Sequence, residues 1–488
     1  MRERYHSVTP SRSSGYVHVR GTDIVDGSGT PLLLRGVGLG NWLLAEGYMW
    51  KFGDDMSSPR QIEGRVRDLV GAESAETFWR RFRDVFVTEA DIARIAELGF
   101  DHVRLPINAR GVLHDDGTFR EDGFAYIDRA IEWCEKHDLW ILLDLHGAPG
   151  GQTGTNIDDS EHGKPELFMD ERFRAQTIAL WQEIARRYKD RTSVLGYDLL
   201  NEPLPNEWQH IYADELIALY VDLTAAIREI DTDHLIMYEG SHWATNWSIF
   251  TSVIDPNSVL QFHRYWCPPE HSSIAEYLEV RDRLQLPIYM GEGGENTPEW
   301  IYTATRLYEQ HGIGWNFWPW KKLDTLTSPV SAVRPDGWEL VNDPAGTPPP
   351  EVADRILDAF LDNVALERCT PHPLVVNALF GRPPLHLPAW GYVEADPTAP
   401  TRFTIQTPAD GSNGIWHHTA GELYAHDELM PVSLVAGQEL EYPLESEPAG
   451  VQLDSSTPDA FETRWAGDRL VIRATATAQL RGLDVLEA

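Results

Sequence analysis

The chain has 488 residues, of which 76 are acidic and 41 are basic, and its formal net charge at pH 7 is −35. This charge argues against nucleic acid as a partner, because proteins bind phosphates largely through Lys and Arg. It also disfavours docking on an anionic membrane surface. The hydrophobic fraction of 42% is ordinary for a globular protein, and the length predicts about two or three domains.

Cysteine usage and the N-terminal segment give two further expectations. The three cysteines, Cys134, Cys267 and Cys369, are too few and odd in number for a disulfide framework, and none forms a Cys-x-x-Cys pair typical of structural zinc. Residues 1–15 are expected to be a disordered tail without the apolar core of a secretory signal. No run of about 18 apolar residues predicts a membrane span. These features predict a cytoplasmic protein whose oligomeric state stays open.

A regular alternation of strand-like and helix-like segments follows residue 16. Two alternating stretches flank the turn Asp26-Gly27-Ser28-Gly29 and predict a β-hairpin. Eight apolar runs then predict buried strands at residues 32–38, 102–107, 140–145, 194–200, 234–238, 259–263, 287–290 and 313–318. Amphipathic segments between and after them predict helices at residues 89–98, 124–137, 170–188, 213–230, 274–284, 298–311 and 350–366. Residues 16–370 are therefore expected to form an α/β fold, a (β/α)8 TIM barrel.

The pattern changes at about residue 371. Short alternating segments separated by Gly, Pro, Asp and Ser predict an all-β, sandwich-like domain over residues 371–488. The expected strands are residues 387–393, 402–406, 414–417, 438–442, 460–465 and 470–477. Five aromatic or imidazole side chains of this domain either pack in its core or form a sugar-binding face: Trp390, Tyr392, Trp416, His417 and His418. Packing against the barrel is the favoured alternative, because alternation at strand spacing is typical of core aromatics.

Polar and tryptophan side chains gather at the carboxyl ends of the predicted strands, where a TIM barrel carries its chemistry. Taken in strand order, the candidates are Arg104, His146, Asn201-Glu202-Pro203, Glu239, His263 with Tyr265, Glu292 and Trp318. Any one of these residues is of little weight, but the joint pattern favours one shared site.

Two carboxylates at strand ends indicate general acid–base and nucleophilic catalysis of acetal hydrolysis. Such a reaction needs one protonated carboxyl to donate to the leaving oxygen and one ionised carboxylate beside the anomeric carbon. Glu202 is the candidate acid, and Glu292, between glycines, is the candidate nucleophile. Glu239 also ends a strand, so it competes for the nucleophile role or contacts a substrate hydroxyl or another site residue. The surroundings of Glu292 favour it over Glu239.

Four neighbours of this pair are expected to contact substrate or the nucleophile. Arg104 would keep Glu292 ionised by charge pairing, and Tyr265 would donate a hydrogen bond to the same carboxylate. Asn201 would hold a ring hydroxyl. Trp318 would form a flat floor for the sugar.

The ordered set of motifs resembles glycoside hydrolase family 5. The matching positions are Arg104, His146, Asn201-Glu202-Pro203, His263 with Tyr265, Glu292 and Trp318, and the string LRGVGLGNWLLAEGYMW is similar to the family's first strand and its exposed Trp loop, which makes Trp42 a candidate sugar contact. The resemblance covers residues 16–370. It implies net retention of configuration without a cofactor or metal, with Glu292 attacking and Glu202 protonating the leaving group. Short strings such as GLGNW look closer to the β-1,3-glucanase and glucosylceramidase-like branches than to cellulases.

The mode of attack and two rival functions stay open. A long polar loop at residues 149–160, together with Trp42, Trp50, Lys51, Trp243 and Lys322, favours a pocket and hence exo-attack on short oligosaccharides or small glycosides. The alternatives are an endo-acting β-glucanase or mannanase, or a non-hydrolytic carbohydrate-binding protein. His146, His242 and His263 suggest a metal site, but the His-x-His of metal-dependent barrels is missing from the first strand.

Overall fold

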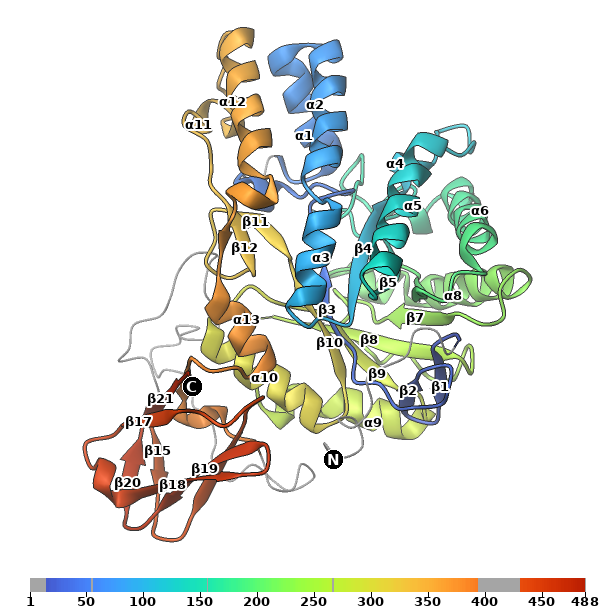
Figure 1. Cartoon of the computed structure of the whole chain (residues 1–488). Coiled ribbons are helices and arrows are strands. Elements are labelled where there is room, and N and C mark those ends of the chain that lie inside the picture. The colour runs from blue at the N-terminus through green and yellow to red at the C-terminus, as the bar shows by residue number, and fades with distance from the viewer. Residues whose placement is uncertain (1–14, 54–55, 156, 266, 394–430, 488) are drawn as a thin grey trace.

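The computed structural model describes residues 15–53, 56–155, 157–265, 267–393 and 431–487. Its centre is a closed barrel of eight parallel strands in the order β10-β3-β4-β5-β6-β7-β8-β9, as Figure 1 shows. The strands are β3 (Arg35–Gly38), β4 (His102–Asn108), β5 (Trp140–Gly147), β6 (Val194–Asp198), β7 (Leu235–Glu239), β8 (Ser258–Arg264), β9 (Ile288–Gly294) and β10 (Gly314–Trp318). The predicted TIM barrel is confirmed, and each strand overlaps its expected range.

Burial explains why the apolar runs became barrel strands. Every residue of β4, β5, β6, β7, β9 and β10 is buried, since side chains fill the interior and helices cover the outside. The covering helices are α3 (Glu89–Glu97), α5 (Glu121–Lys136), α6 (Glu171–Tyr188), α8 (Ala213–Arg228), α9 (Ala275–Leu284), α10 (Pro298–Gln310) and α12 (Pro350–Asn363). Among the helices of the described residues, none combines the length and the apolar character needed to cross a bilayer.

Two helices between β3 and α3 were missing from the sequence prediction. They are α1 (Pro59–Val70) and α2 (Ala72–Val85), and they stand beside α12 at one end of the molecule (Figure 1). Ser58 and Gln61 form a capping box at the start of α1, with Pro59 at its first position. The two helices bury an aromatic cluster around Trp50, whose ring centroid lies 5.0 Å from that of Phe82.

The predicted turn at Asp26 is confirmed, and a second hairpin turn precedes it. Strands β1 (His18–Arg20) and β2 (Asp23–Val25) pair antiparallel, so the turn is Gly21-Thr22. Gly21 has a φ of +62°, which suits the two-residue hairpin turns that match strand twist. In the expected turn the Asp26 carboxylate accepts hydrogen bonds from the backbone N–H groups of Ser28 and Thr30. Val25 and Pro31, on either side of this turn, form an antiparallel bridge.

The C-terminal region is rich in strands, as predicted, but it begins with a helix. Helix α13 (Pro373–Phe380) lies where an all-β pattern was expected, because its apolar residues pack against α10. The strands that follow are β14 (Leu385–Pro388), β15 (Val432–Leu434), β16 (Glu439–Pro443), β17 (Gly450–Asp454), β18 (Phe461–Ala466), β19 (Arg469–Ala474), β20 (Ala478–Leu480) and β21 (Gly482–Leu486). The expected strands at 402–406 and 414–417, with Trp416, His417 and His418, lie outside the described residues.

Polar contacts and apolar packing join this region to the barrel. The Tyr302 hydroxyl on α10 donates to the Pro443 carbonyl at 3.0 Å, and Arg306 donates to the Leu379 carbonyl at 2.6 Å. Trp390 is only 4% exposed and belongs to the same core cluster as the barrel residues. This burial favours a packing role over an open sugar-binding face for Trp390. We propose a C-terminal domain whose described residues, 371–393 and 431–487, pack on the barrel.

Candidate active site

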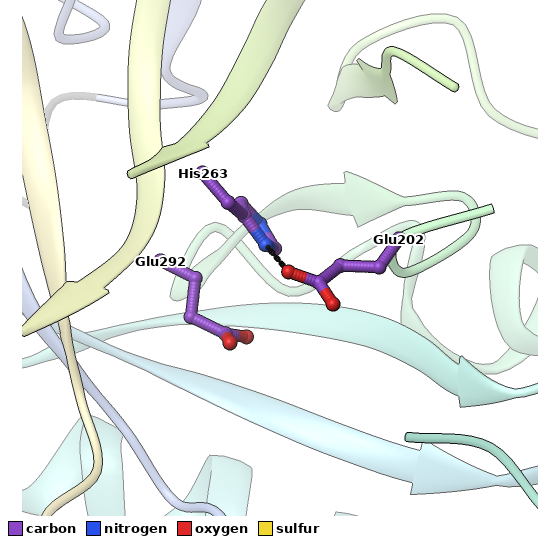
Figure 2. A group of neighbouring side chains, drawn as sticks. All are labelled: Glu202, His263 and Glu292. Carbon is purple, nitrogen blue, oxygen red and sulfur yellow. Dashed lines mark hydrogen bonds and ion pairs between the residues drawn. The ribbon is translucent and has the colours of Figure 1, made fainter. Parts of the chain in front are cut away.

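Three side chains from one side of the barrel meet at the carboxyl ends of its strands. Glu202 follows β6, His263 lies in β8 and Glu292 lies in β9. One carboxylate oxygen of each glutamate and one ring nitrogen of His263 lie within 4.8 Å of one another. Figure 2 shows His263 bonded to Glu202, with the Glu292 carboxylate facing the same space. The structure thus brings together the two glutamates singled out in the sequence.

Glu202 is held in an unusual backbone conformation by two contacts. Its φ is +44°, in the left-handed region that non-glycine residues rarely adopt. Its backbone N–H donates to Glu239 Oε2 at 2.7 Å, and its Oε1 accepts from His263 Nδ1 at 2.6 Å. Strain of this kind persists where the surroundings determine the conformation, so Glu239 and His263 fix the position of Glu202.

Both carboxylate oxygens of Glu292 accept hydrogen bonds. The Tyr265 hydroxyl donates to Oε1 at 2.7 Å, and Arg104 Nη1 donates to Oε2 at 2.8 Å. Burial is the main influence on the pKa of Glu292 and raises it. His263 and Arg104 lower this pKa, and the nearby Glu202 raises it, so that the net pKa lies above 4.5.

Arg104 is the centre of a fully buried charge network below the pair. Its side chain is 0% exposed. Its partners are Asp144 at 3.2 Å, Asp198 at 2.9 Å, Glu239 at 3.1 Å, Glu292 at 2.8 Å and the side-chain oxygen of Asn201 at 2.8 Å. Buried charges are tolerated when they are paired and hydrogen-bonded. Arg104 therefore offsets part of the negative charge of the site and fixes where its acidic side chains point.

Replacing Arg104 with methionine is expected to lower the free energy of unfolding by about 3–5 kcal/mol, because several carboxylates would stay buried without their cation. The measurement is urea unfolding followed by far-UV circular dichroism. Arg81→Met is the matched control, since Arg81 pairs with Asp358 on the surface, where about 0–1 kcal/mol is expected. Equal losses of unfolding free energy in the two variants would contradict the conclusion that Arg104 stabilises several buried carboxylates.

His146 is held neutral with a defined tautomer. Its Nδ1 lies 2.7 Å from Asp144 Oδ2, and its Nε2 lies 3.3 Å from the Asn201 side-chain nitrogen. Nδ1–H therefore donates to the carboxylate while Nε2 accepts from the amide. Burial, with a smaller effect of Arg104, lowers the pKa of His146 to about 3. The imidazole ring lies parallel to the Trp318 indole, with centroids 5.4 Å apart.

Three polar side chains lie at one edge of the Trp318 ring. The Trp318 indole N–H donates to the Tyr48 hydroxyl at 3.0 Å, and that hydroxyl donates to Glu295 Oε2 at 3.3 Å. Lys322 forms an ion pair with Glu295 and lies over the Tyr48 ring. These side chains are buried or half-buried, so a sugar on Trp318 would meet a polar wall at this edge.

Glu46 belongs to this site, although the sequence prediction missed it. Its Oε1 is buried without a hydrogen-bond partner in the described part of the chain, 4.0 Å from His146 Nε2. Burial raises the pKa of Glu46 well above 4.5, and Glu292 and Glu295 raise it further. Burial and the neighbouring carboxylates therefore favour the protonated form of Glu46. The available signal was a lone carboxylate in the apolar string that follows Trp42.

Three expected contacts lie elsewhere. Trp42 stacks on Trp133 of α5, and its indole N–H donates to the Arg83 carbonyl of α2, so its contacts are with these helices and not with the glutamate pair. Trp50 is in the aromatic core. Glu239 is 0% exposed beneath Glu202, so its position fits positioning of that residue and contradicts direct contact with a substrate hydroxyl.

The loop at residues 149–160 packs inward and ties two strand ends together. The Gln152 side-chain nitrogen donates to the His146 carbonyl at 2.7 Å and to the Asn201 carbonyl at 2.9 Å. Asp158 accepts from the backbone of Thr153 and Ser160 and so fixes the loop. Gln152 was missed in the sequence, where it is one polar residue in a Gly-rich segment.

The group Glu202, His263 and Glu292 also has the residue types of a metal site. The described residues contain this one group of at least three His, Cys, Asp or Glu side chains close enough to share an ion. However, His263 Nδ1 is engaged by Glu202 and His263 Nε2 lies 3.3 Å from Glu239. Both imidazole nitrogens therefore already face carboxylates. This arrangement fits proton handling better than ligation of a metal ion.

A model of the cellulase family, glycosyl hydrolase family 5, matches residues 66–324, more than half of the chain. The chain belongs to this family. Family 5 enzymes are glycoside hydrolases that retain anomeric configuration. The resemblance predicted from the ordered strand-end motifs is thus confirmed.

Relatives within family 5 have several activities. A β-xylosidase of Phanerodontia chrysosporium is 36% identical over 237 residues, which cover 48% of this chain and 48% of that protein. This chain therefore spans about half the length of that relative. A probable glucan 1,3-β-glucosidase A of Emericella nidulans is 28% identical over 67% of this chain and 82% of its own length. Endoglucanase C of Acetivibrio thermocellus is 27% identical over 51% of this chain and 88% of its own length.

One solved structure shares nearly the whole architecture of this family 5 chain. An endogalactoceramidase superposes with a TM-score of 0.53 and 18% identity, and the match covers 97% of this chain and 100% of that one. At this identity the similarity concerns the fold alone. It extends beyond the barrel into the strand-rich C-terminal region.

Proposed function

We propose that this protein is a retaining β-glycosidase in which Glu292 is the nucleophile and Glu202 is the acid–base residue. The observation that carries the proposal is the approach of the two carboxylates, whose oxygens lie within 4.8 Å. Retaining enzymes place their carboxyl groups about 5–5.5 Å apart, whereas inverting enzymes need about 6.5–9.5 Å to admit a water. The spacing supports direct attack by a carboxylate.

The contacts of each glutamate support its role. Glu292 would attack the anomeric carbon as a carboxylate and form a glycosyl ester, while Glu202 gives its proton to the leaving oxygen. Glu202 would then take a proton from water, which attacks the ester and releases Glu292. Arg104 and Tyr265 bind the carboxylate form of Glu292, so they favour its ionised, attacking state.

His263 supports the change of charge on Glu202. Burial lowers the pKa of His263, but Glu239 and Glu292 raise it more, and the net pKa is well above 6.5. The imidazolium would donate Nδ1–H to Glu202 and Nε2–H to Glu239. The carboxylate that Glu202 becomes after donating its proton would thus face a cation.

The polar side chains at one edge of Trp318 support exo-action on short oligosaccharides or small β-glycosides. Trp318 and His146 would receive one sugar ring, and Tyr48, Glu295 and Lys322 occupy the space at the edge of Trp318. A further sugar residue would have to displace a buried ion pair there, which is costly. The names of two relatives, a β-xylosidase and a glucan 1,3-β-glucosidase, agree with this mode.

Glu46 is proposed to bind a sugar hydroxyl as a neutral acid. Glu46→Leu is expected to lower kcat/KM by about 10–100-fold, because a buried hydrogen bond to the substrate would be lost. Glu46→Gln is the matched variant and is expected to stay within about threefold of the parent, since an amide also donates and accepts. Steady-state kinetics on one p-nitrophenyl glycoside compares them. A glutamine variant as impaired as the leucine variant would show that a charge at position 46 is required.

The acid limb of the pH profile is expected to report Glu292. The carboxylate is the active form, so kcat/KM falls as the pH drops through the Glu292 pKa, which lies above 4.5. Tyr265→Phe removes a hydrogen bond that stabilises the carboxylate, so the limb is expected to move to higher pH. The kcat/KM profile of both proteins between pH 3.5 and 8 provides the measurement. A limb that stays in place or moves down would assign it to another group.

The test of function is a panel of p-nitrophenyl glycosides with and without EDTA. It contains the β-glucoside, β-xyloside, β-mannoside, β-galactoside, β-cellobioside and an α-arabinoside. Release from a monosaccharide glycoside that EDTA leaves unchanged is the expected result. Cleavage of the cellobioside alone would favour the endo-acting alternative. No release from any member, together with binding of sugars, would favour a carbohydrate-binding protein.

A further inference from the structure

A partly exposed tryptophan, Trp243, lies in the turn that follows β7, at the carboxyl end of the barrel. Its one ring contact within the described residues is with His242, at a centroid distance of 4.9 Å and an interplanar angle of 47°. Its indole N–H has no acceptor among these residues and keeps access to solvent. Trp243 therefore has ring surface and a hydrogen-bond donor that a ligand can reach.

The backbone around Trp243 is held in a conformation that costs free energy. His242, Trp243 and Ala244 have φ values of +55°, +53° and +61°, so three successive non-glycine residues are left-handed. Such residues normally occur singly, because the Cβ atom crowds the following carbonyl oxygen. The Thr245 hydroxyl donates to the His242 carbonyl at 2.6 Å and helps to hold the turn. Backbone strain of this kind is typical of active sites and ligand-binding segments.

Two hydrogen bonds place this turn beside the segment that follows Glu202. The His242 N–H donates to the Leu204 carbonyl at 3.1 Å, and the Asn206 N–H donates to His242 Nδ1 at 3.0 Å. Glu202 is the proposed acid and gives its proton to the leaving oxygen, so the leaving group has to lie on the Glu202 side of the bond that breaks. Trp243 therefore lies next to the loop of the residue that handles the leaving group.

The order of the strands puts Trp243 across the barrel from the side chains proposed to receive the sugar. Glu202 follows β6 and Trp243 follows β7, whereas Trp318 ends β10 and Tyr48 follows β3. In the closed barrel β6 lies four strands from β10, and β7 lies four strands from β3, so the members of each pair are on opposite sides. A substrate whose sugar lies on Trp318 would therefore extend its leaving group toward Trp243.

The polar groups of the turn are neutral donors. Because His242 Nδ1 accepts from the Asn206 N–H, the neutral imidazole carries its proton on Nε2. Burial and the nearby His210 lower the pKa of His242, which favours this neutral form, and no carboxylate of the described residues contributes to the shift. The turn thus presents two N–H groups, His242 Nε2–H and Trp243 Nε1–H, beside a flat indole.

We propose that Trp243 determines leaving-group specificity by stacking on a flat aromatic ring, so that aryl β-glycosides are the substrate class of this enzyme. Aromatic rings attract one another beyond the burial of their area, and oxygen substituents on such a ring can accept from the two N–H groups. A sugar leaving group would instead bring several hydroxyl donors to a turn without a carboxylate, whereas the opposite side has Glu46. This proposal rests on the proposed roles of Glu202 and Glu292.

The test compares the 4-methylumbelliferyl and methyl β-glycosides of the sugar that the glycoside panel shows to be cleaved fastest. Sugar release gives kcat/KM for the full chain and for Trp243→Leu, and the parent-to-variant ratio within one substrate removes the difference in leaving-group reactivity. Trp243→Leu is expected to lower kcat/KM about tenfold on the aryl glycoside, because the stacking surface is lost. The methyl glycoside has no ring to stack, so its kcat/KM is expected to stay within about twofold.

Two further variants and one further substrate make the result specific. Trp243→Phe keeps a flat ring and is expected to stay within about threefold of the parent on the aryl glycoside. Trp465→Leu removes a partly buried tryptophan on β18 and is expected to change neither ratio. Equal losses on the aryl and methyl glycosides in Trp243→Leu would overturn the proposal. So would a tenfold loss on a disaccharide of the same sugar, since the leaving group bound there would then be a sugar. A chain that cleaves none of these substrates would contradict the glycosidase assignment itself, which equal losses would leave standing.

Discussion

Replacement of Glu292 with alanine is expected to lower kcat/KM by at least about 10⁴-fold, because the group that forms the covalent bond would be gone. The Ala side chain leaves space beside the anomeric carbon where an external nucleophile fits. Azide should therefore restore turnover of an activated β-glycoside and yield the α-glycosyl azide. Steady-state rates and NMR of the azide product provide the measurement.

The control for this variant is Glu295, a second buried carboxylate of the site, which has other partners. Glu295→Ala removes a glutamate three residues away that pairs with Lys322, and azide should not rescue whatever activity it loses. Turnover by Glu292→Ala at the parent rate would contradict the nucleophile assignment, and so would a β-glycosyl azide.

Removal of Glu202 has the second largest expected effect, and the size of that effect should depend on the leaving group. Glu202→Ala is expected to lose about 10²–10⁴-fold on a substrate with a sugar or alkyl leaving group, which needs a proton. A dinitrophenyl glycoside leaves without a proton, so the glycosyl ester should still form, and a burst of dinitrophenol should precede slow hydrolysis.

Azide distinguishes this variant from the first. In Glu202→Ala, azide would attack the anomeric carbon of the glycosyl ester on the face opposite Glu292, where Glu202 normally activates water. The product should therefore be the β-glycosyl azide. Equal losses on good and poor leaving groups would assign the acid role to another residue. Rapid-quench kinetics on the two substrate classes tests the first point, and NMR of the azide product tests the second.

The barrel could be predicted because its signals are local. Each strand is a continuous apolar run, and helical periodicity marks most of the helices between them. Helices α1 and α2 have an amphipathic pattern as clear as that of the predicted helices, but they are inserted between β3 and α3, where a regular strand–helix alternation has no place for them. Helix α13 was missed because its short apolar run resembles a strand, and contact with α10 explains its burial.

The candidate site was predicted where strand position alone places a side chain. The carboxyl ends of β6, β8 and β9 converge by topology, which brings Glu202, His263 and Glu292 together. Loop residues were harder to place. Trp42 and Glu46 are four residues apart in one loop, yet Trp42 packs on Trp133 and Glu46 faces His146. No periodicity in the sequence distinguishes these two directions.

The central claim is that Glu292 forms a covalent bond on the face opposite the leaving group, so that two displacements return the original configuration. The most direct measurement is ¹H NMR of the first sugar released from whichever β-glycoside of the panel is cleaved fastest, recorded before mutarotation. The β-anomer is predicted to appear first and then to equilibrate with the α-anomer. The α-anomer as first product would mean that water attacks directly, and it would contradict the assignment of Glu292 as nucleophile.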